Sequence, residues 1–419
     1  MDEFIIEGGQ RLEGEVTLSG AKNSVLAIMA ATILAEGATT LTNVPNLRDT
    51  RTISALLKHL GAEVVFSNGR AEINSDGINN LVAPYDLVSQ MRASFLVLGP
   101  MVARYGEAEV SLPGGCAIGD RPITLHLDGL AAMGADITLE HGYVKAEAPH
   151  GLQGADMFLD FPTVTGTENL LMAATLADGP TVIRNAAREP EVADLARVLT
   201  AMGADIKGAG SDTIEIEGVK SLKGISYEVM ADRIEAGTFM IAAGITGGRI
   251  TIKKAPISCL TAVEKKLKQT GCAIDHLDEN TMVVTGPSEI RAVDIKTEPY
   301  PGFPTDLQAQ FMSLMSLAKG LSVIKETIFE DRFIHVNELK RLGADIRLSG
   351  NTAIIEGVEK LSGAPVMATD LRASACLILA GMAAEGQTEL SRVYHIDRGY
   401  EKIEEKLTAL GANIRRIQK

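Results

Sequence analysis

The residues with the clearest chemical potential begin with a cysteine in a glycine-rich segment. Cys116 lies in PGGCAIGDRP, residues 113–122, five residues before Arg121. Glycines leave the backbone free to adopt left-handed conformations and give little side-chain cover. A thiol with the ordinary pKa of about 8.5 is mostly protonated at neutral pH and can donate a proton, whereas a nearby guanidinium can lower that pKa and produce a nucleophile. Cys116 is therefore a candidate acid or nucleophile, and the alternative is an inert small side chain.

Lysine and arginine side chains mark candidate anion sites. Lys22-Asn23 opens the first apolar helix, where a lysine is at the unfavourable end of the helix dipole. Such a lysine either binds an anion together with free backbone N–H groups or is a solvated surface charge. Arg92 begins a second apolar helix, and Arg121 precedes a proline. Arginine is the preferred bidentate partner of phosphate and carboxylate, so both are candidates for an anion site, unless they are ordinary surface charges.

A carboxylate is mounted on an unusually stiff segment. Residues 298–308, EPYPGFPTDLQ, contain three prolines before Asp306. A rigidly held carboxylate suits a general base. An acidic residue at this position could equally cap the helix that follows.

Aspartate and arginine recur as close neighbours in the last third of the chain. Isolated pairs of this kind are usually surface ion pairs of little energetic value, but three at related places indicate an arginine cluster. The sequence has no P-loop, so anion binding would depend on Arg and Lys rather than on Mg²⁺. The three pairs are Asp331-Arg332, Asp370 with Arg372, and Asp397-Arg398.

The elements that must position these residues follow a sixfold repeat. A helix end, a Gly-Ala phrase and a β-like run recur every 68 to 73 residues, with glycines at 61, 134, 203, 271, 343 and 411. Periodicity of this length indicates internal duplication. Each repeat reads as strand, apolar helix, strand, helix and hairpin, and Asn68-Gly69 is a strong hairpin signal. A helix that is apolar on nearly all sides has to be buried.

Six such repeats predict two lobes of three repeats each, with buried helices and outer sheets. We expect residues 1–20 and 230–419 to form one lobe and residues 21–229 the other, which carries the mobile Cys116 segment 111–122. The first strand, Phe4 to Ile6, is expected to pair with the last repeat. A ligand is expected in the cleft between the lobes.

Composition excludes several classes of protein. The net charge of −14 argues against nucleic acid or an anionic membrane as partner. The longest apolar run, residues 24–35, is too short to span a bilayer, and the acidic N-terminus is unlike a signal peptide, so a cytoplasmic location is expected. The four cysteines lack zinc-site spacing, and neither a metal nor a cofactor is expected.

Taken together, these motifs resemble the enolpyruvyl transferase family over essentially the whole chain. The resemblance implies an inside-out α/β barrel in two lobes, built from six βαβαββ-type repeats. It also implies transfer of enolpyruvate from phosphoenolpyruvate to the 3′-hydroxyl of UDP-N-acetylglucosamine through a tetrahedral phosphate-bearing ketal, the first committed step of peptidoglycan synthesis and hence a step needed for cell shape and division. No obligatory protein partner is implied. The motifs are Ser19 to Asn23, Leu112 to Pro122, Thr163-Val164 with Thr167 to Asn169, Asp232 to Thr238, and Pro301 to Gln310.

The resemblance assigns roles to residues of this sequence. Asp306 would take the proton of the sugar hydroxyl, and Asp370 would assist proton handling. Cys116 would be the general acid at the methylene carbon, can form an adduct with phosphoenolpyruvate, and is the thiol that fosfomycin alkylates. The residues around phosphoenolpyruvate would be Lys22, Asn23, Arg121 and Arg398 near the phosphate, and Arg332 and Arg372 near the carboxylate. The residues contacting the nucleotide sugar would be Asn23, Arg92, Arg121, Pro122, Ile123, Thr124, Leu125, Thr163, Val164, Asp306 and Ile328.

Three other functions remain open on the sequence. The sister enzyme 3-phosphoshikimate 1-carboxyvinyltransferase shares the fold and the donor but normally lacks the cysteine. RNA-end cyclases share the repeat, although the acidic charge argues against them. A non-catalytic nucleotide-sugar sensor would not need Asp306, Arg332 and Arg372 together.

Overall fold

The computed structural model describes residues 2–113 and 123–418, which divide into two compact units. Unit 1 comprises the residues up to Ser19 together with Ala231 onwards, and unit 2 lies within Gly20–Met230. Cys116, Arg121 and Pro122 lie outside the described residues. No helix among the described residues combines the length and apolar character needed to cross a bilayer.

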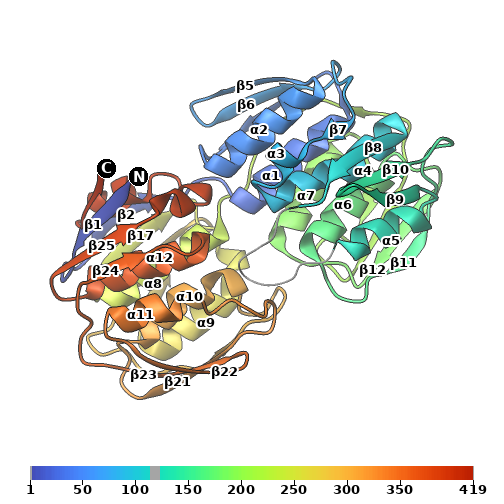
Figure 1. Cartoon of the computed structure of the whole chain (residues 1–419). Coiled ribbons are helices and arrows are strands. Elements are labelled where there is room, and N and C mark those ends of the chain that lie inside the picture. The colour runs from blue at the N-terminus through green and yellow to red at the C-terminus, as the bar shows by residue number, and fades with distance from the viewer. Residues whose placement is uncertain (1, 114–122, 419) are drawn as a thin grey trace. The chain divides into compact units, whose positions relative to one another are not determined.

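Unit 2 contains three four-stranded sheets around apolar helices (Figure 1). The first sheet is β16 (Ser226–Glu228), β4 (Ala38–Thr42), β6 (Arg70–Asn74) and β5 (Glu63–Ser67). The second is β7 (Val82–Ala83), β8 (Glu107–Ser111), β10 (Tyr143–Glu147) and β9 (Asp136–Glu140). The third is β11 (Asp156–Phe158), β12 (Pro180–Arg184), β14 (Thr213–Glu217) and β13 (Asp205–Lys207), and β3 (Ala35–Glu36) pairs separately with β15 (Leu222–Lys223).

The helices of unit 2 alternate with these strands. The buried ones are α1 (Lys22–Ala31), η2 (Arg92–Val97) continuing into α4 (Leu98–Tyr105), and α6 (Val164–Ala174). The others are η1 (Thr32–Leu34), α2 (Arg48–Leu60), α3 (Tyr85–Val88), α5 (Thr124–Ala132) and α7 (Pro190–Met202).

Unit 1 repeats this plan with three further four-stranded sheets. They are β18 (Ala273–His276), β19 (Thr281–Thr285), β17 (Arg249–Lys253) and β2 (Glu13–Thr17); β20 (Ile295–Lys296), β21 (Leu321–Lys325), β23 (Thr352–Glu356) and β22 (Asp345–Ser349); and β24 (Pro365–Met367), β25 (Gln387–Ser391), β1 (Glu3–Glu7) and β26 (Asn413–Ile417). The buried helices are α8 (Arg233–Thr246), η4 (Thr305–Leu307) continuing into α10 (Gln308–Met315), and α12 (Leu371–Ala383). The others are η3 (Ile257–Cys259), α9 (Thr261–Thr270), α11 (Val336–Arg341), η5 (Val393–Arg398) and α13 (Ile403–Ala409).

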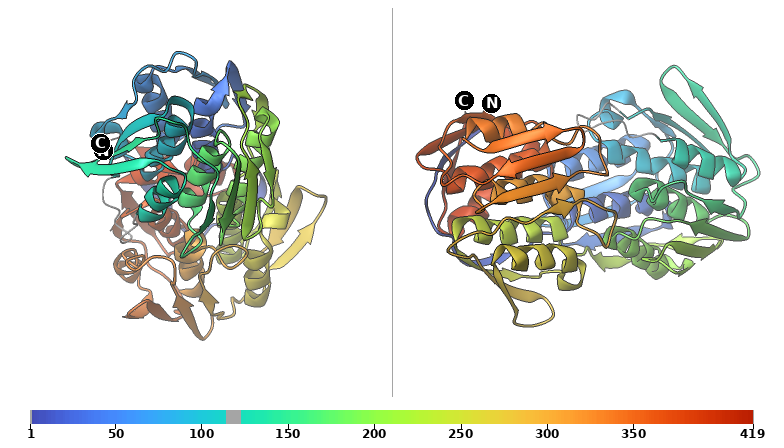
Figure 2. Two further views of the ribbon diagram at one scale, coloured as in Figure 1. Left: turned by 90° about the vertical axis from the view of Figure 1, so that its right-hand side faces the viewer. Right: turned by 90° about the horizontal axis from the view of Figure 1, so that it is seen from below.

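Burial on all sides explains why three repeats associate in each unit. Almost every residue of α8 and α12 is buried, and α8, α10 and α12 pack against one another. One repeat can cover only one side of its apolar helix, whereas three repeats enclose all three helices with sheets on the outside. This inside-out α/β arrangement, with helices in the interior and sheets at the periphery of each unit, is visible in two further views (Figure 2).

The repeated glycines stand where the sequence pattern requires left-handed backbone. All six glycines of the Gly-Ala phrases have positive φ, from 89° at Gly134 to 117° at Gly203. Gly61, for example, ends α2 and donates its N–H to the carbonyl of Leu57, a common helix termination. The predicted hairpin at Asn68-Gly69 is confirmed, because both residues have positive φ and join β5 to β6.

Three strands, β1, β2 and β16, pair with strands that are far away in the sequence. β1 inserts between β25 and β26, which confirms the expected pairing of the first strand with the last repeat. The strand before α1, β2, lies parallel to β17, and the strand before α8, β16, lies parallel to β4. The first and fourth repeats thus exchange their opening strands.

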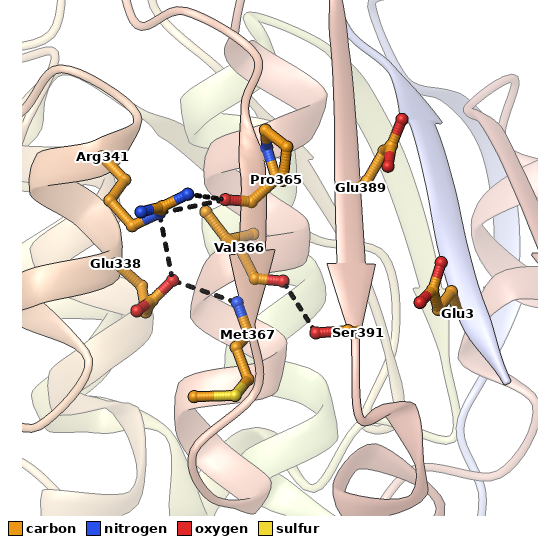
Figure 3. Close-up of a pocket in the computed structure, with 8 residues that line it drawn as sticks. All are labelled: Glu3, Glu338, Arg341, Pro365, Val366, Met367, Glu389 and Ser391. Atoms are coloured by element: carbon orange, nitrogen blue, oxygen red, sulfur yellow. Dashed lines mark hydrogen bonds and ion pairs between the residues drawn. The ribbon is translucent and has the colours of Figure 1, made fainter. Parts of the chain in front are cut away.

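The edge strand β24 is covered by side chains of α11 (Figure 3). Arg341 donates from Nε and Nη2 to the carbonyl of Pro365, and Met367 donates its N–H to Glu338. This cover protects an edge that could otherwise pair with another chain. A pocket of about 370 Å³ beside it is lined by Glu3, Glu338, Arg341, Pro365, Val366, Met367, Glu389 and Ser391, none of which is a predicted site residue.

Gly357 offers a test of how tightly the sheets close over the buried helices. A Cβ atom there would lie 1.6 Å from the carbonyl oxygen of Ala318, a backbone atom that cannot rotate away. We expect Gly357→Ala to lower the free energy of unfolding by about 3 kcal/mol or more. Gly350→Ala, at a left-handed turn with open space, should cost only about 1 kcal/mol. Equal losses in urea denaturation would contradict this account of the packing.

Candidate active site

The predicted site residues gather at the beginnings of buried helices. A helix that is apolar on all sides can carry a charged side chain at its end, because the end lies outside the apolar interior. At the N-terminal end, the unpaired backbone N–H groups also favour anions. The residues concerned are Lys22 and Asn23 in the first turn of α1, Arg92 at the start of η2, Thr163 and Val164 at the start of α6, Asp306 in η4, and Asp370 and Arg372 at the start of α12.

Asp306 is the centre of an ion cluster in unit 1. Its Oδ1 accepts from Nη2 of Arg332 at 2.7 Å, and its Oδ2 accepts from Nη2 of Arg372 at 2.9 Å. The arginine side chains are only 7% and 4% exposed, whereas that of Asp306 is 24% exposed. One carboxylate therefore holds two buried guanidinium groups while keeping an accessible face.

Charge in this cluster controls the protonation of Asp306. Burial by itself would raise the pKa of the carboxyl, but Coulombic attraction from Arg372 and Arg332 overcomes it and holds that pKa well below its usual value. With both arginines attached, Asp306 is ionised and a weak base. It would become a stronger base if the arginines turned to another anion.

Arg372 carries a donor that the cluster does not use. Its guanidinium lies over the ring of Tyr400, 5.5 Å from the centroid, and Nη2 binds Asp306. Within the described part of the chain, the buried Nη1 has no hydrogen-bond partner. A buried cationic donor without a partner is energetically costly, so it favours an acceptor supplied by a ligand.

Several roles differ from the simplest expectations. The helix-cap interpretation of Asp306 is wrong, because its carboxylate binds side chains and no side chain caps η4 or α10. Asp370 is a cap instead, and its Oδ1 accepts from the N–H groups of Arg372 and Ala373. This bond holds the backbone of Arg372 at the start of α12.

The third pair, Asp397-Arg398, differs from the other two because no contact joins it to Asp306 among the contacts described. Asp397 pairs with Arg416, and Arg398 ends η5 as a half-buried residue. The structure thus brings Arg332 and Arg372 together on Asp306, and the part of Arg398 in a phosphate site stays a prediction.

Lys22 is held by a buried carboxylate in unit 2. Its Nζ lies 3.2 Å from Oδ2 of Asp49, and its side chain is only 14% exposed. The interpretation as a freely solvated surface lysine is therefore wrong. Ser24, in the same turn of α1, donates from Oγ to Oδ2 of buried Asp194 at 2.5 Å. α1 has no side-chain cap, so this bond helps to anchor its first turn.

Besides Asn23 on α1 and Arg92 on η2, the described nucleotide-sugar candidates of unit 2 lie at the beginnings of two adjoining helices, α5 and α6. Ile123 precedes α5, and Thr124 and Leu125 are its first two residues. Thr163 caps α6, its Oγ1 accepting from the N–H of Gly166 at 3.3 Å. Ile328, in unit 1, donates its N–H to Glu326.

A buried histidine joins α5 to α6. Asn169 accepts from the N–H of Gly99 through Oδ1, so its amide nitrogen must face Nδ1 of His126, 3.1 Å away, and donate to it. The imidazole proton is then on Nε2, 3.3 Å from the hydroxyl of Thr165. Burial, with a contribution from Arg92, lowers the pKa of His126 to about 3. A neutral imidazole thus ties the start of α5 to the start of α6.

Three buried polar residues that contact the surroundings of the candidate site were missed from the sequence: Asp194, Glu326 and His126. Each is buried in the structure and binds groups beside a predicted site residue. Partners such as Ser24 for Asp194, Thr305 for Glu326 and Thr165 for His126 lie 21 to 170 residues away in the sequence. Sequence spacing therefore could not identify them.

The neutral state of His126 gives a pH-dependent contribution to stability. The ring stays unprotonated in the folded state down to about pH 3 but binds a proton near pH 6.5 when unfolded, so stability falls as the pH decreases through that interval. Between pH 6 and pH 4, the free energy of unfolding of His126→Gln should fall less steeply than that of the parent protein, by about 1.4 kcal/mol per pH unit. Denaturant titrations at several pH values measure both slopes. Packing defects shift the whole curve without changing its slope, so parallel curves would contradict the assignment.

The family profile and the similar proteins found by sequence comparison agree on the family of this chain. A profile of the family described as EPSP synthase (3-phosphoshikimate 1-carboxyvinyltransferase) matches residues 6–407. Proteins named UDP-N-acetylglucosamine 1-carboxyvinyltransferase from Desulfosudis oleivorans and Geotalea uraniireducens are each 60% identical to this chain, over 417 and 418 residues, with 100% of both chains covered in each case.

Solved structures show the same fold. The enolpyruvyl transferase NikO from Streptomyces tendae superposes with a TM-score of 0.90 at 26% identity, covering 100% of this chain and 99% of that one. EPSP synthase from Acinetobacter baumannii gives a TM-score of 0.77 at 20% identity with both chains fully covered, which speaks to the fold alone.

Proposed function

Because the chain belongs to the enolpyruvyl transferase family, we propose that it transfers enolpyruvate from phosphoenolpyruvate to the 3′-hydroxyl of UDP-N-acetylglucosamine and releases phosphate. The full-length relatives at about 60% identity support this acceptor over 3-phosphoshikimate. Such a reaction would supply peptidoglycan synthesis, and we place it in the cytoplasm.

The observation that carries the proposal is the pair of buried arginines on Asp306. Phosphoenolpyruvate has a carboxylate and a phosphate, and Arg332 and Arg372 offer the planar donors that suit such groups. The unused Nη1 of Arg372 supplies a further donor. A sensor that only bound a nucleotide sugar would not need this cluster around a carboxylate.

The same geometry suggests how the base would be activated. Binding of the substrate carboxylate to Arg332 and Arg372 would weaken their hold on Asp306 and raise its pKa. Asp306 would then accept the proton of the sugar hydroxyl as the oxygen attacks C2 of phosphoenolpyruvate. Cys116 would donate a proton to the methylene carbon, which gives the tetrahedral ketal with a methyl group. Loss of phosphate from C2 together with a proton from that methyl group would re-form the double bond and complete the transfer.

Lys22 would bind the phosphate in this scheme, together with Arg121 and Arg398. The side chain of Lys22 is mostly buried, so its ammonium group is already partly desolvated before substrate arrives. An incoming phosphate would replace Asp49 as its partner. Asn23, Arg92, Thr163 and Val164 would contact the nucleotide sugar.

Phosphate release tests the proposal directly. We expect release from phosphoenolpyruvate with UDP-N-acetylglucosamine and none with 3-phosphoshikimate. Asp306→Asn should lower kcat by about 10²- to 10⁴-fold, because the amide cannot accept the proton. The matched variant Asp331→Asn makes the same change at an exposed position in the Arg332 loop and should retain activity. Release with 3-phosphoshikimate would favour the sister activity, and no release with either acceptor would favour a sensor.

A further inference from the structure

A buried glutamate that has no role in the proposed reaction is linked by hydrogen bonds to the cluster of Asp306, Arg332 and Arg372. Glu326 directly follows β21 and is 1% exposed. Its Oε1 accepts from the hydroxyl of Thr297 at 2.7 Å and from the N–H groups of Ile328 and Phe329 at 2.8 and 3.3 Å. Its Oε2 accepts from the hydroxyl of Thr305 at 2.8 Å. The carboxylate therefore uses both oxygens within its own unit.

The bond to Thr305 determines the direction of that hydroxyl. A hydroxyl has one proton, and here a carboxylate, which can only accept, takes it. The oxygen of Thr305 is then left to accept, and Nη1 of Arg332 donates to it at 2.8 Å. Arg332 is thus held at two points, by Thr305 through Nη1 and by Asp306 through Nη2.

We propose that Glu326 is a positioning residue that acts through Thr305 to orient the guanidinium of Arg332 toward Asp306 and the phosphoenolpyruvate carboxylate. The inference rests on the proposed function and adds to it a relay of Glu326, Thr305, Arg332 and Asp306. Two-point fixation sets the plane of the guanidinium, and a planar fork recognises a carboxylate only in the correct plane. The same carboxylate fixes the backbone at Ile328, a predicted nucleotide-sugar contact.

Substitutions at Thr305 separate orientation from bulk. Thr305→Val keeps the shape of the side chain but removes the oxygen that accepts from Arg332. Thr305→Ser keeps the hydroxyl. We expect Thr305→Val to lower kcat/KM for phosphoenolpyruvate about tenfold, mainly through KM, and Thr305→Ser to restore most of the activity.

Glu326→Gln tests the origin of the orientation. The single amide oxygen would have to serve Thr297 and the two N–H groups, so the amide nitrogen would face Thr305. That hydroxyl oxygen could accept from both the amide and Arg332, but its proton would lose its acceptor, so the direction of the Arg332 bond would no longer be fixed. The variant should raise KM for phosphoenolpyruvate in the same direction as Thr305→Val, by a smaller factor.

The matched control is Thr297→Val. Thr297 is buried and also donates to Glu326, but it does not contact Arg332. Its loss should lower the melting temperature while changing KM for phosphoenolpyruvate by less than about twofold. Because both threonines donate to Glu326 but only Thr305 accepts from Arg332, the pair distinguishes a relay from general support of the loop.

The kinetics of these variants distinguish the relay from the alternatives. A rise in KM with Thr305→Val that Thr305→Ser reverses and Thr297→Val does not reproduce supports the relay. Unchanged kinetics in Thr305→Val, or equal losses in Thr305→Val and Thr297→Val, overturn it while leaving the proposed function intact. An inactive parent protein overturns the proposed function itself. If Glu326→Gln does not fold, the Thr305 pair still decides the question.

Discussion

Burial of helices that have no polar side is the constraint on which the rest of this protein depends. The helices α1, α6, α8 and α12 are apolar around most of their circumference, so none can border water along its length. Three repeats in each unit meet this requirement because each contributes one helix to the interior and one sheet to the outside. Apart from the buried Glu168 of α6, the lysine, arginine and glutamate side chains of these helices lie in their first turns, where several of the candidate site residues also lie.

The same constraint shapes the electrostatics of the site. A charge near a dry helix core has to be compensated, since an unpaired buried ion costs several kcal/mol. Asp306 is compensated by Arg332 and Arg372, and Lys22 is paired with Asp49. An anionic substrate would therefore exchange partners with groups that have already lost much of their water. This preorganisation is the usual source of electrostatic catalysis, because little rearrangement is left for the reacting state.

Much of the architecture was predictable from short patterns. The Gly-Ala glycines, the Asn68-Gly69 turn and the pairing of the first strand with the last repeat all follow from local preferences or from the repeat itself. Candidate site residues could also be selected locally, because a lysine at a helix start and a carboxylate after prolines are unusual. The repeat pattern alone does not distinguish β2 from β16, since either strand satisfies it in either sheet, but the expected lobe bounds already grouped β2 with residues 230–419 and β16 with residues 21–229.

The sequence by itself determined the sixfold repeat, the buried character of its helices and the chemical types available at their ends. These properties are encoded by residues within a few positions of one another, where the helix and strand periods act. Only the tertiary structure decided which partners those residues have: that Asp306 binds Arg372, 66 positions away, and does not cap its own helix, and that Glu326 reaches Arg332 through Thr305. Such partnerships depend on how distant segments approach, and that approach results from packing the whole unit.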